Sequence, residues 1–190
     1  MKLGLFGGSF DPVHLGHLLV AQAALEELEL DRLFFIPAAQ SPFKPDDKPA
    51  PASLRLQWLR LALAGQKRCE VDEQELRRGG VSYAIATVRD YAKRFSGAEL
   101  FYLVGADHAA KLNQWSEPEE LARLAEVVLV PRPGETPRGL PTPFRGRTLK
   151  GFPLAVSSSE IRARVRAGRT IEPLLPPFVA EAICAAHIYH

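Results

Sequence analysis

The stretch LFGGSFDPVHLGH, residues 5–17, decides the fold class of this 190-residue chain. An apolar run over residues 3–6 ends at two glycines, and apolar side chains then return at near-helical spacing over residues 15–28. The pattern predicts a buried strand, a glycine turn and a helix. A doubly wound α/β sheet opens with this unit, and its first turn is where such a sheet binds phosphates.

The same alternation continues along the chain. Strands are predicted over residues 33–36, 69–71, 100–104 and 127–130, with helices over residues 54–63, 83–91 and 119–125. Ser53 and Ser82 are the expected N-caps of the first two of these helices. We therefore expect a Rossmann-like α/β fold, a mostly parallel sheet with helices on both faces, built as a single domain over residues 1–190.

Two proline-rich segments, residues 37–51 and 131–153, interrupt this rhythm and are expected to be long loops over the surface. In a sheet of this kind ligands bind beyond the carboxyl ends of the strands, so loops there face substrate.

Composition narrows the class of protein. The chain is 46% hydrophobic and 24% charged, as in an ordinary globular protein, and its net charge of +2 gives no strong field for nucleic acid or an anionic membrane. Cys69 and Cys184 lie in no zinc-ligand or disulfide pattern. No apolar run has the length of a signal peptide or a membrane span, so we expect a cytoplasmic protein with neither nucleic acid nor membrane as a partner.

The glycine turn carries residues suited to a polyphosphate. Glycines let backbone N–H groups approach an anion, and His14 and His17, three positions apart, can share one side of the first helical turn. The turn is neither a GxGxxG fingerprint nor a GxxxxGK[ST] loop. A capping histidine and a metal half-site are the alternatives, but no HExxH or carboxylate companion supports a metal.

A second helix start, VSSSEIR over residues 156–162, offers a serine cap and Arg162 to phosphate oxygens, and Gly168 can end that helix. On its own, such a start is common in surface helices. The phosphate-binding interpretation of this helix start is favoured only when it is considered together with the glycine turn.

These segments resemble the HxGH nucleotidyltransferase superfamily, and GGSFDPVHLGH is similar to the block of its nicotinate-nucleotide adenylyltransferases. The resemblance extends over essentially the whole chain, with VSSSEIR close to ISSTxIR and GAD at residues 105–107 close to a motif beside adenosine. It implies that ATP is bound by Gly7, Gly8, Ser9, Phe10, His14, Gly16, His17, Gly105, Asp107, Ser157, Ser158, Ile161 and Arg162, with His14, His17 and Arg162 as the catalytic residues.

The resemblance also places an acceptor site. SYA at residues 82–84 is similar to a SYTxDT helix start whose N–H groups bind a pyridine carboxylate, with alanines at 84 and 86 as departures. Trp115, in LNQW, would stack on the pyridine ring, although a core tryptophan is the alternative. Phe43 stands where the family has histidine. It precedes Lys44, the residue expected to bind the acceptor phosphate. The implied acceptor residues are Lys44, Ser82, Tyr83, Ala84, Trp115 and Arg132.

The expected reaction is a direct in-line attack by the phosphate of nicotinic acid mononucleotide on the α-phosphorus of ATP, yielding a dinucleotide and pyrophosphate in NAD biosynthesis. Mg²⁺, held mainly by ATP phosphates, is the expected cofactor. The alternatives are another acceptor, such as nicotinamide mononucleotide or phosphopantetheine, and a regulatory or RNA-binding module. The oligomeric state stays open, a homodimer included.

Overall fold

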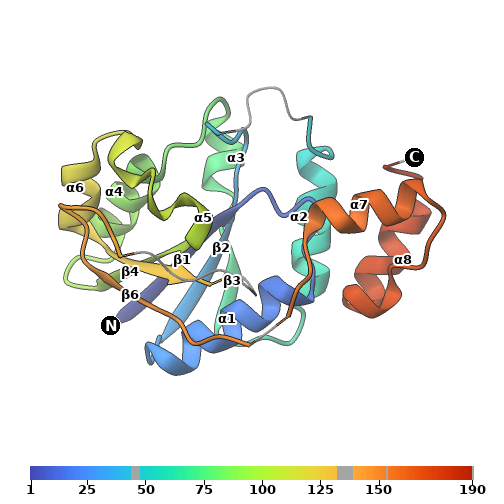
Figure 1. Cartoon of the computed structure of the whole chain (residues 1–190), viewed down its shortest axis with the longest axis horizontal. Coiled ribbons are helices and arrows are strands. Elements are labelled where there is room, and N and C mark those ends of the chain that lie inside the picture. The colour runs from blue at the N-terminus through green and yellow to red at the C-terminus, as the bar shows by residue number, and fades with distance from the viewer. Residues whose placement is uncertain (44–47, 132–138, 153, 190) are drawn as a thin grey trace.

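One parallel sheet organises the computed structural model, which describes residues 1–43, 48–131, 139–152 and 154–189. Within these residues the strands run in the order β3-β2-β1-β4-β5-β6, and every neighbouring pair is parallel (Figure 1). Their bounds are β1 (Lys2–Gly8), β2 (Arg32–Pro37), β3 (Cys69–Val71), β4 (Glu99–Gly105), β5 (Glu126–Val130) and β6 (Gly146–Thr148). The expected Rossmann-like α/β fold is confirmed.

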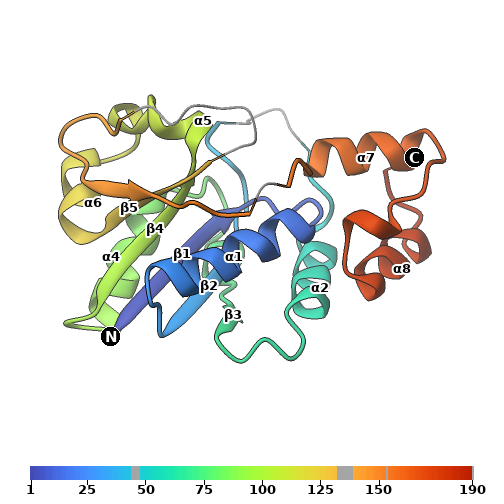
Figure 2. The ribbon, with the colours of Figure 1, turned by 60° about the horizontal axis from the view of Figure 1, so that its bottom comes forward.

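Helices cover both faces of this sheet. They are α1 (Leu15–Glu27), α2 (Ala52–Ala62), α3 (Gln74–Arg78), α4 (Ala84–Arg94), α5 (Ala106–Ala109), α6 (Pro118–Leu124), α7 (Ser158–Arg166) and α8 (Pro177–Ala185), with 3-10 turns at Leu112–Gln114 and Glu172–Leu174. Figures 1 and 2 show α7 and α8 beyond α2, at the end of the molecule opposite α4 and α6. None of the helices described is long and apolar enough to cross a bilayer.

The core is two apolar layers separated by the sheet. Leu33 and Phe35 of β2 pack with α1, α2 and α8, whereas Phe34 and Ile36 pack with α4 and α6. Successive strand residues point to opposite faces, so a strand covered on both faces must be apolar at every position. This is why β2 reads as a continuous apolar run.

The strand order reverses between β1 and β4, because the chain proceeds outward from β1 through β2 to β3 and then from β4 through β5 to β6. Ligands bind such sheets in the crevice beyond the carboxyl ends of the two strands at this reversal. The glycine turn follows β1 and the GAD segment follows β4, so the fold brings two of the predicted motifs to that place.

Two predicted helix caps are wrong. The N-cap of α2 is Pro51, with Ser53 inside the helix, and the N-cap of α4 is Tyr83. The Ser82 hydroxyl instead accepts a hydrogen bond from the backbone N–H of Ala39 at 2.9 Å, which ties the segment after β2 to the start of α4. Ser157 does cap α7, accepting from the N–H of Glu160 at 3.2 Å.

Strand β6 lies inside residues 131–153, which the sequence predicts to be a loop. All three of its residues are exposed, so no apolar pattern marks it. It joins the sheet through backbone pairing with β5, and a Cβ on Gly146 would lie 1.8 Å from the carbonyl oxygen of Val127. Only glycine permits that approach.

Candidate active site

Two stacked histidines open helix α1. His14 is the N-cap and His17 is the third helical residue, and their ring centroids lie 3.7 Å apart. The backbone N–H of His14 donates to Nδ1 of His17 at 3.2 Å. In a neutral imidazole whose Nδ1 accepts, the proton is on Nε2. His17 therefore presents a fixed N–H donor at its outer nitrogen.

Burial keeps both rings neutral. Only 6% of His14 is exposed, and burial lowers its pKa to about 4. The pKa of His17 is lowered well below its usual value by burial and by the neighbouring His14. Nδ1 of His14 has no hydrogen-bond partner among the described residues. A buried polar nitrogen without a hydrogen-bond partner costs free energy, and an N–H at that nitrogen would offset the cost by donating to a bound anion.

Acid should destabilise the fold through His14. Because the folded-state pKa of about 4 lies below the unfolded value, protons bind the unfolded chain preferentially. The contribution of His14 to the free energy of unfolding is then fully present above about pH 6.5. It decreases by about 3 kcal/mol as the pH falls toward 4. Urea unfolding between pH 7.5 and 4 measures this. His14→Asn, which retains a good N-cap, should lessen the slope; an unchanged slope would contradict the assignment to His14.

The residues around the histidines pack tightly. Phe10 has a positive φ of 46°, is 2% exposed, and places its ring 5.0 Å from that of His17. A Cβ on Gly8 would lie 3.2 Å from the Phe10 ring, and one on Gly16 would lie 3.0 Å from the His14 ring. Any ligand contact from Phe10 must therefore come from its backbone, and these two glycines make room for side chains.

Helix α7 reaches the same turn from far along the sequence. Arg162 Nη1 donates to the carbonyl oxygen of Asp11 at 2.8 Å and lies 3.7 Å from Asp11 Oδ2. The Ser158 hydroxyl donates to the carbonyl oxygen of Pro12, also at 2.8 Å. Ile161 is fully buried in the core, so it anchors the helix and its side chain cannot meet a ligand. The structure thus joins the two predicted halves of the phosphate site.

Arg55 is a buried residue of this region that the sequence analysis missed. It is 2% exposed; its Nη1 donates to the carbonyl oxygens of Ser9 at 2.8 Å and Ala38 at 2.9 Å, and its Nε to that of Ala50 at 3.0 Å. A signal existed, because the buried positions of α2 are 55, 58, 59 and 62. An arginine in the apolar stripe of an amphipathic helix must have buried acceptors.

The GAD segment follows β4 directly. Gly105 is the N-cap of α5, and Asp107 lies in the first turn of that helix, exposed, with a carboxylate oxygen 3.7 Å from His108 Nε2. A Cβ on Gly105 would lie 2.5 Å from Asp107 Oδ1. On the neighbouring strand, a Cβ on Gly7 would lie 2.8 Å from the hydroxyl of Tyr102. Both glycines therefore border the reversal point of the sheet.

Three of the predicted acceptor residues, Ser82, Tyr83 and Ala84, lie at the start of α4. Tyr83 is 47% exposed, and the N–H of Ser82 donates to the carbonyl oxygen of Gln40 at 2.9 Å. The ring of Trp115 lies 5.6 Å from that of Phe43 and 6.1 Å from that of Tyr102. Trp115 is half-buried, with its Nε1 unpaired among the described residues, so it borders both the core and this aromatic group.

Phe43 also lies 5.2 Å from the ring of His108. Phe43, at the position where the resemblance implies a histidine, thus takes part in aromatic contacts. Lys44 and Arg132 lie outside the described residues.

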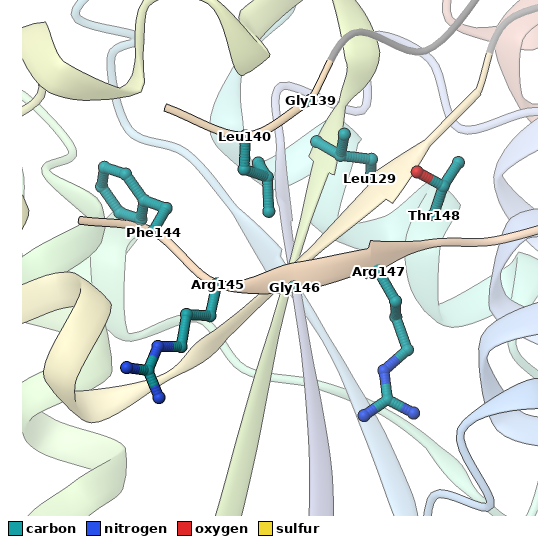
Figure 3. A pocket seen from close by; sticks show the side chains of 8 residues that line it. All are labelled: Leu129, Gly139, Leu140, Phe144, Arg145, Gly146, Arg147 and Thr148. Atoms are coloured by element: carbon teal, nitrogen blue, oxygen red, sulfur yellow. The ribbon is translucent and has the colours of Figure 1, made fainter. Parts of the chain in front are cut away.

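A cavity of about 380 Å³ lies beside β6, away from all these residues. Figure 3 shows the guanidinium groups of Arg145 and Arg147 pointing to the same side, away from Leu140. Arg147 is already paired with Glu126 at 2.6 and 3.0 Å. The described residues that line this cavity include no histidine or carboxylate, so we place the chemistry at the histidine turn.

Comparison with known proteins identifies the family. Residues 5–164 match the family model described as cytidylyltransferase-like. A protein of Opitutus terrae named "Probable nicotinate-nucleotide adenylyltransferase" is 40% identical over 100% of this chain and 98% of its own length. One of the same name from Thermus thermophilus is 42% identical over 93% of this chain and 92% of its own length.

The chain belongs to the nicotinate-nucleotide adenylyltransferase family. It is accordingly a nucleotidyltransferase. Among solved structures, a nicotinic acid mononucleotide adenylyltransferase of Plasmodium falciparum complexed with NaAD superposes with a TM-score of 0.80. It is 14% identical and the match covers 99% of this chain and 97% of that one, which shows that the two share a fold.

Proposed function

We propose that this chain transfers the adenylyl group of ATP to nicotinic acid mononucleotide, giving nicotinic acid adenine dinucleotide and pyrophosphate. The observation that carries the proposal is the meeting of His14, His17 and Arg162 at one turn, beyond the carboxyl end of the central strand. The names of the full-length relatives support the acceptor. We further propose that residues 1–190 act as a single nucleotidyltransferase domain, and a cytoplasmic location stays a prediction.

The ATP half of the site works by positioning and charge stabilisation. The acceptor phosphate supplies the nucleophile, so the protein needs no covalent intermediate. As the bond from the α-phosphorus to the leaving pyrophosphate breaks, negative charge grows on oxygens that the His17 N–H and the Arg162 guanidinium can meet. The backbone of residues 7–10, Gly16, Gly105 and Asp107 would line the remaining nucleotide.

Mg²⁺ fits this site as a companion of the triphosphate. Magnesium prefers oxygen ligands, keeps several waters and is commonly bound through substrate phosphates. The described residues hold no group of three or more His, Cys, Asp or Glu side chains placed for a metal, so the donor set points to phosphates and water as its main ligands. When bound, the ion would neutralise part of the triphosphate charge.

The acceptor half should recognise a carboxylate through backbone N–H groups at the start of α4, near Tyr83 and Ala84, beside Ser82, whose own N–H already donates to Gln40. The free N–H groups and dipole of a helix N-terminus stabilise an anion there. Trp115 would stack on the pyridine ring, beside Phe43. Lys44 and Arg132 would bind the acceptor phosphate.

The test compares two acceptors. The protein is incubated with ATP, Mg²⁺ and either nicotinic acid mononucleotide or its amide, and pyrophosphate and dinucleotide are measured. A carboxylate that gains charge-assisted hydrogen bonds should give a kcat/KM roughly 10- to 100-fold higher than the carboxamide. Equal turnover would overturn the carboxylate site, and ATP binding without pyrophosphate would favour a regulatory nucleotide-binding protein.

A further inference from the structure

Tyr189 lies beyond α8 and contacts the opposite end of the sequence. Its hydroxyl donates a hydrogen bond to Asp11 Oδ1, across 178 positions. Its ring centroid is 6.0 Å from that of Trp58 on α2. Burial and the Asp11 carboxylate raise the pKa of Tyr189, so it stays a neutral donor at physiological pH. No sequence motif assigns a role to this residue.

The Asp11 carboxylate is a junction of four segments. Asp11 is 5% exposed, and its Oδ1 also accepts from the backbone N–H of Ala50 at 3.0 Å. Its other oxygen, Oδ2, lies 3.7 Å from Arg162 Nη1. The first turn, the residues before α2, helix α7 and Tyr189 therefore meet at one buried carboxylate.

The two carboxylate oxygens have different partners. Tyr189 and Ala50 both donate to Oδ1, whereas the Arg162 guanidinium faces Oδ2 at 3.7 Å, beyond hydrogen-bond distance. A carboxylate without the tyrosine hydroxyl would be left with unused acceptor capacity in a buried place. Arg55 also interacts electrostatically with Asp11, but its Nε and Nη1 already donate to carbonyl oxygens. Arg162 lies 3.7 Å from Oδ2 and can approach more closely, and a closer Asp11–Arg162 pair would compete with phosphate for the guanidinium.

We propose that Tyr189 is a positioning residue for the ATP site, one that occupies Asp11 and so leaves Arg162 available to the triphosphate. This inference rests on the proposed adenylyl transfer, because it assigns Arg162 to the phosphates. The effect is specific to ATP, since the acceptor groups near Tyr83 and Trp115 do not touch this junction.

The test is Tyr189→Phe, which removes one hydroxyl and keeps the ring against Trp58. The KM for ATP should rise about tenfold, the usual effect of one charge-assisted hydrogen bond, while the KM for the acceptor stays unchanged. Calorimetric titration with a non-hydrolysable ATP analogue should show the same loss of affinity without any turnover.

Tyr91→Phe is the matched control. Tyr91 lies on helix α4, and its hydroxyl donates to the buried Asp72 carboxylate at 2.7 Å. This variant therefore also loses one tyrosine–aspartate hydrogen bond. It should lower thermal stability and leave both KM values unchanged. In an Asp11→Asn background, Tyr189→Phe should add less than it does alone, since the two residues act through one contact.

The outcomes separate the two proposals. An unchanged ATP affinity in Tyr189→Phe, or a parallel rise of both KM values with falling stability as in a general structural defect, overturns the inference. A wild-type protein that binds the analogue but forms no pyrophosphate overturns the proposed function, and the calorimetric comparison of the two variants then still decides the role of Tyr189.

Discussion

His17→Ala should lower kcat by roughly 100- to 1000-fold, the usual cost of removing one preorganised donor to developing charge. The ring is held before substrate arrives, because the backbone N–H of His14 donates to its Nδ1 and leaves the proton on Nε2. A donor fixed in this way needs no reorientation as the pyrophosphate leaves. Steady-state kinetics with saturating ATP and acceptor measure the change, and thermal unfolding verifies that the variant folds.

A matched variant separates the donor from the ring. His17→Asn keeps a side-chain N–H, so its kcat should lie between that of the wild type and that of His17→Ala, which has no donor at this position. A folded His17→Ala protein with a kcat near that of the wild type would show that this histidine does not stabilise the leaving group.

Arg55→Ala should cost about 3–5 kcal/mol of folding free energy, because it removes a buried guanidinium that donates to one buried and two partly buried carbonyl oxygens of loop residues. For a domain of this size that corresponds to a fall in Tm of about 10 °C. Arg55→Lys keeps a charge but lacks the planar fork that reaches all three carbonyls, so it should lie in between. Differential scanning calorimetry gives both values.

Arg60→Ala on the same helix is the control. Its side chain is 62% exposed and its partner, Glu73, lies at 3.3 Å, so the loss should stay within about 1 kcal/mol. If the two alanine variants were equally stable, the buried contacts of Arg55 would contribute nothing to folding.

The central strands could be predicted because they are covered on both faces. Strand β4 is buried and carries no charged residue from Leu100 to Val104, and that run is visible in the sequence. The histidine turn was visible for a related reason, since glycines and paired histidines at a strand-to-helix junction have few structural uses. The tautomer of His17 and the stacking of its ring on that of His14 could not be predicted, because both depend on the three-dimensional arrangement of the turn.

What could not be predicted depends on contacts between distant segments. Strand β6 is exposed and is held by backbone pairing with β5, so no apolar pattern marks it, and the need for glycine at residue 146 becomes visible only once Val127 is known to be its neighbour. The predicted cap of α4 is wrong because the Ser82 hydroxyl accepts a hydrogen bond from the N–H of Ala39 in another segment. The predicted cap of α2 is wrong because the helix begins one residue before Ser53. Tyr189 shows the same limit, because nothing local to residue 189 indicates that its partner is Asp11.

The union of α7 with the first turn also bears on how the protein is made. Strands β1 to β5 come from residues 2–130, so a growing chain can begin to assemble most of its sheet before residue 162 leaves the ribosome. Arg162 must then find a carbonyl 151 positions behind it. Contacts between residues so far apart in sequence form late, because closing a long loop loses conformational entropy before the favourable contacts have formed. The nascent chain therefore acquires a folded sheet first and a complete nucleotide pocket last.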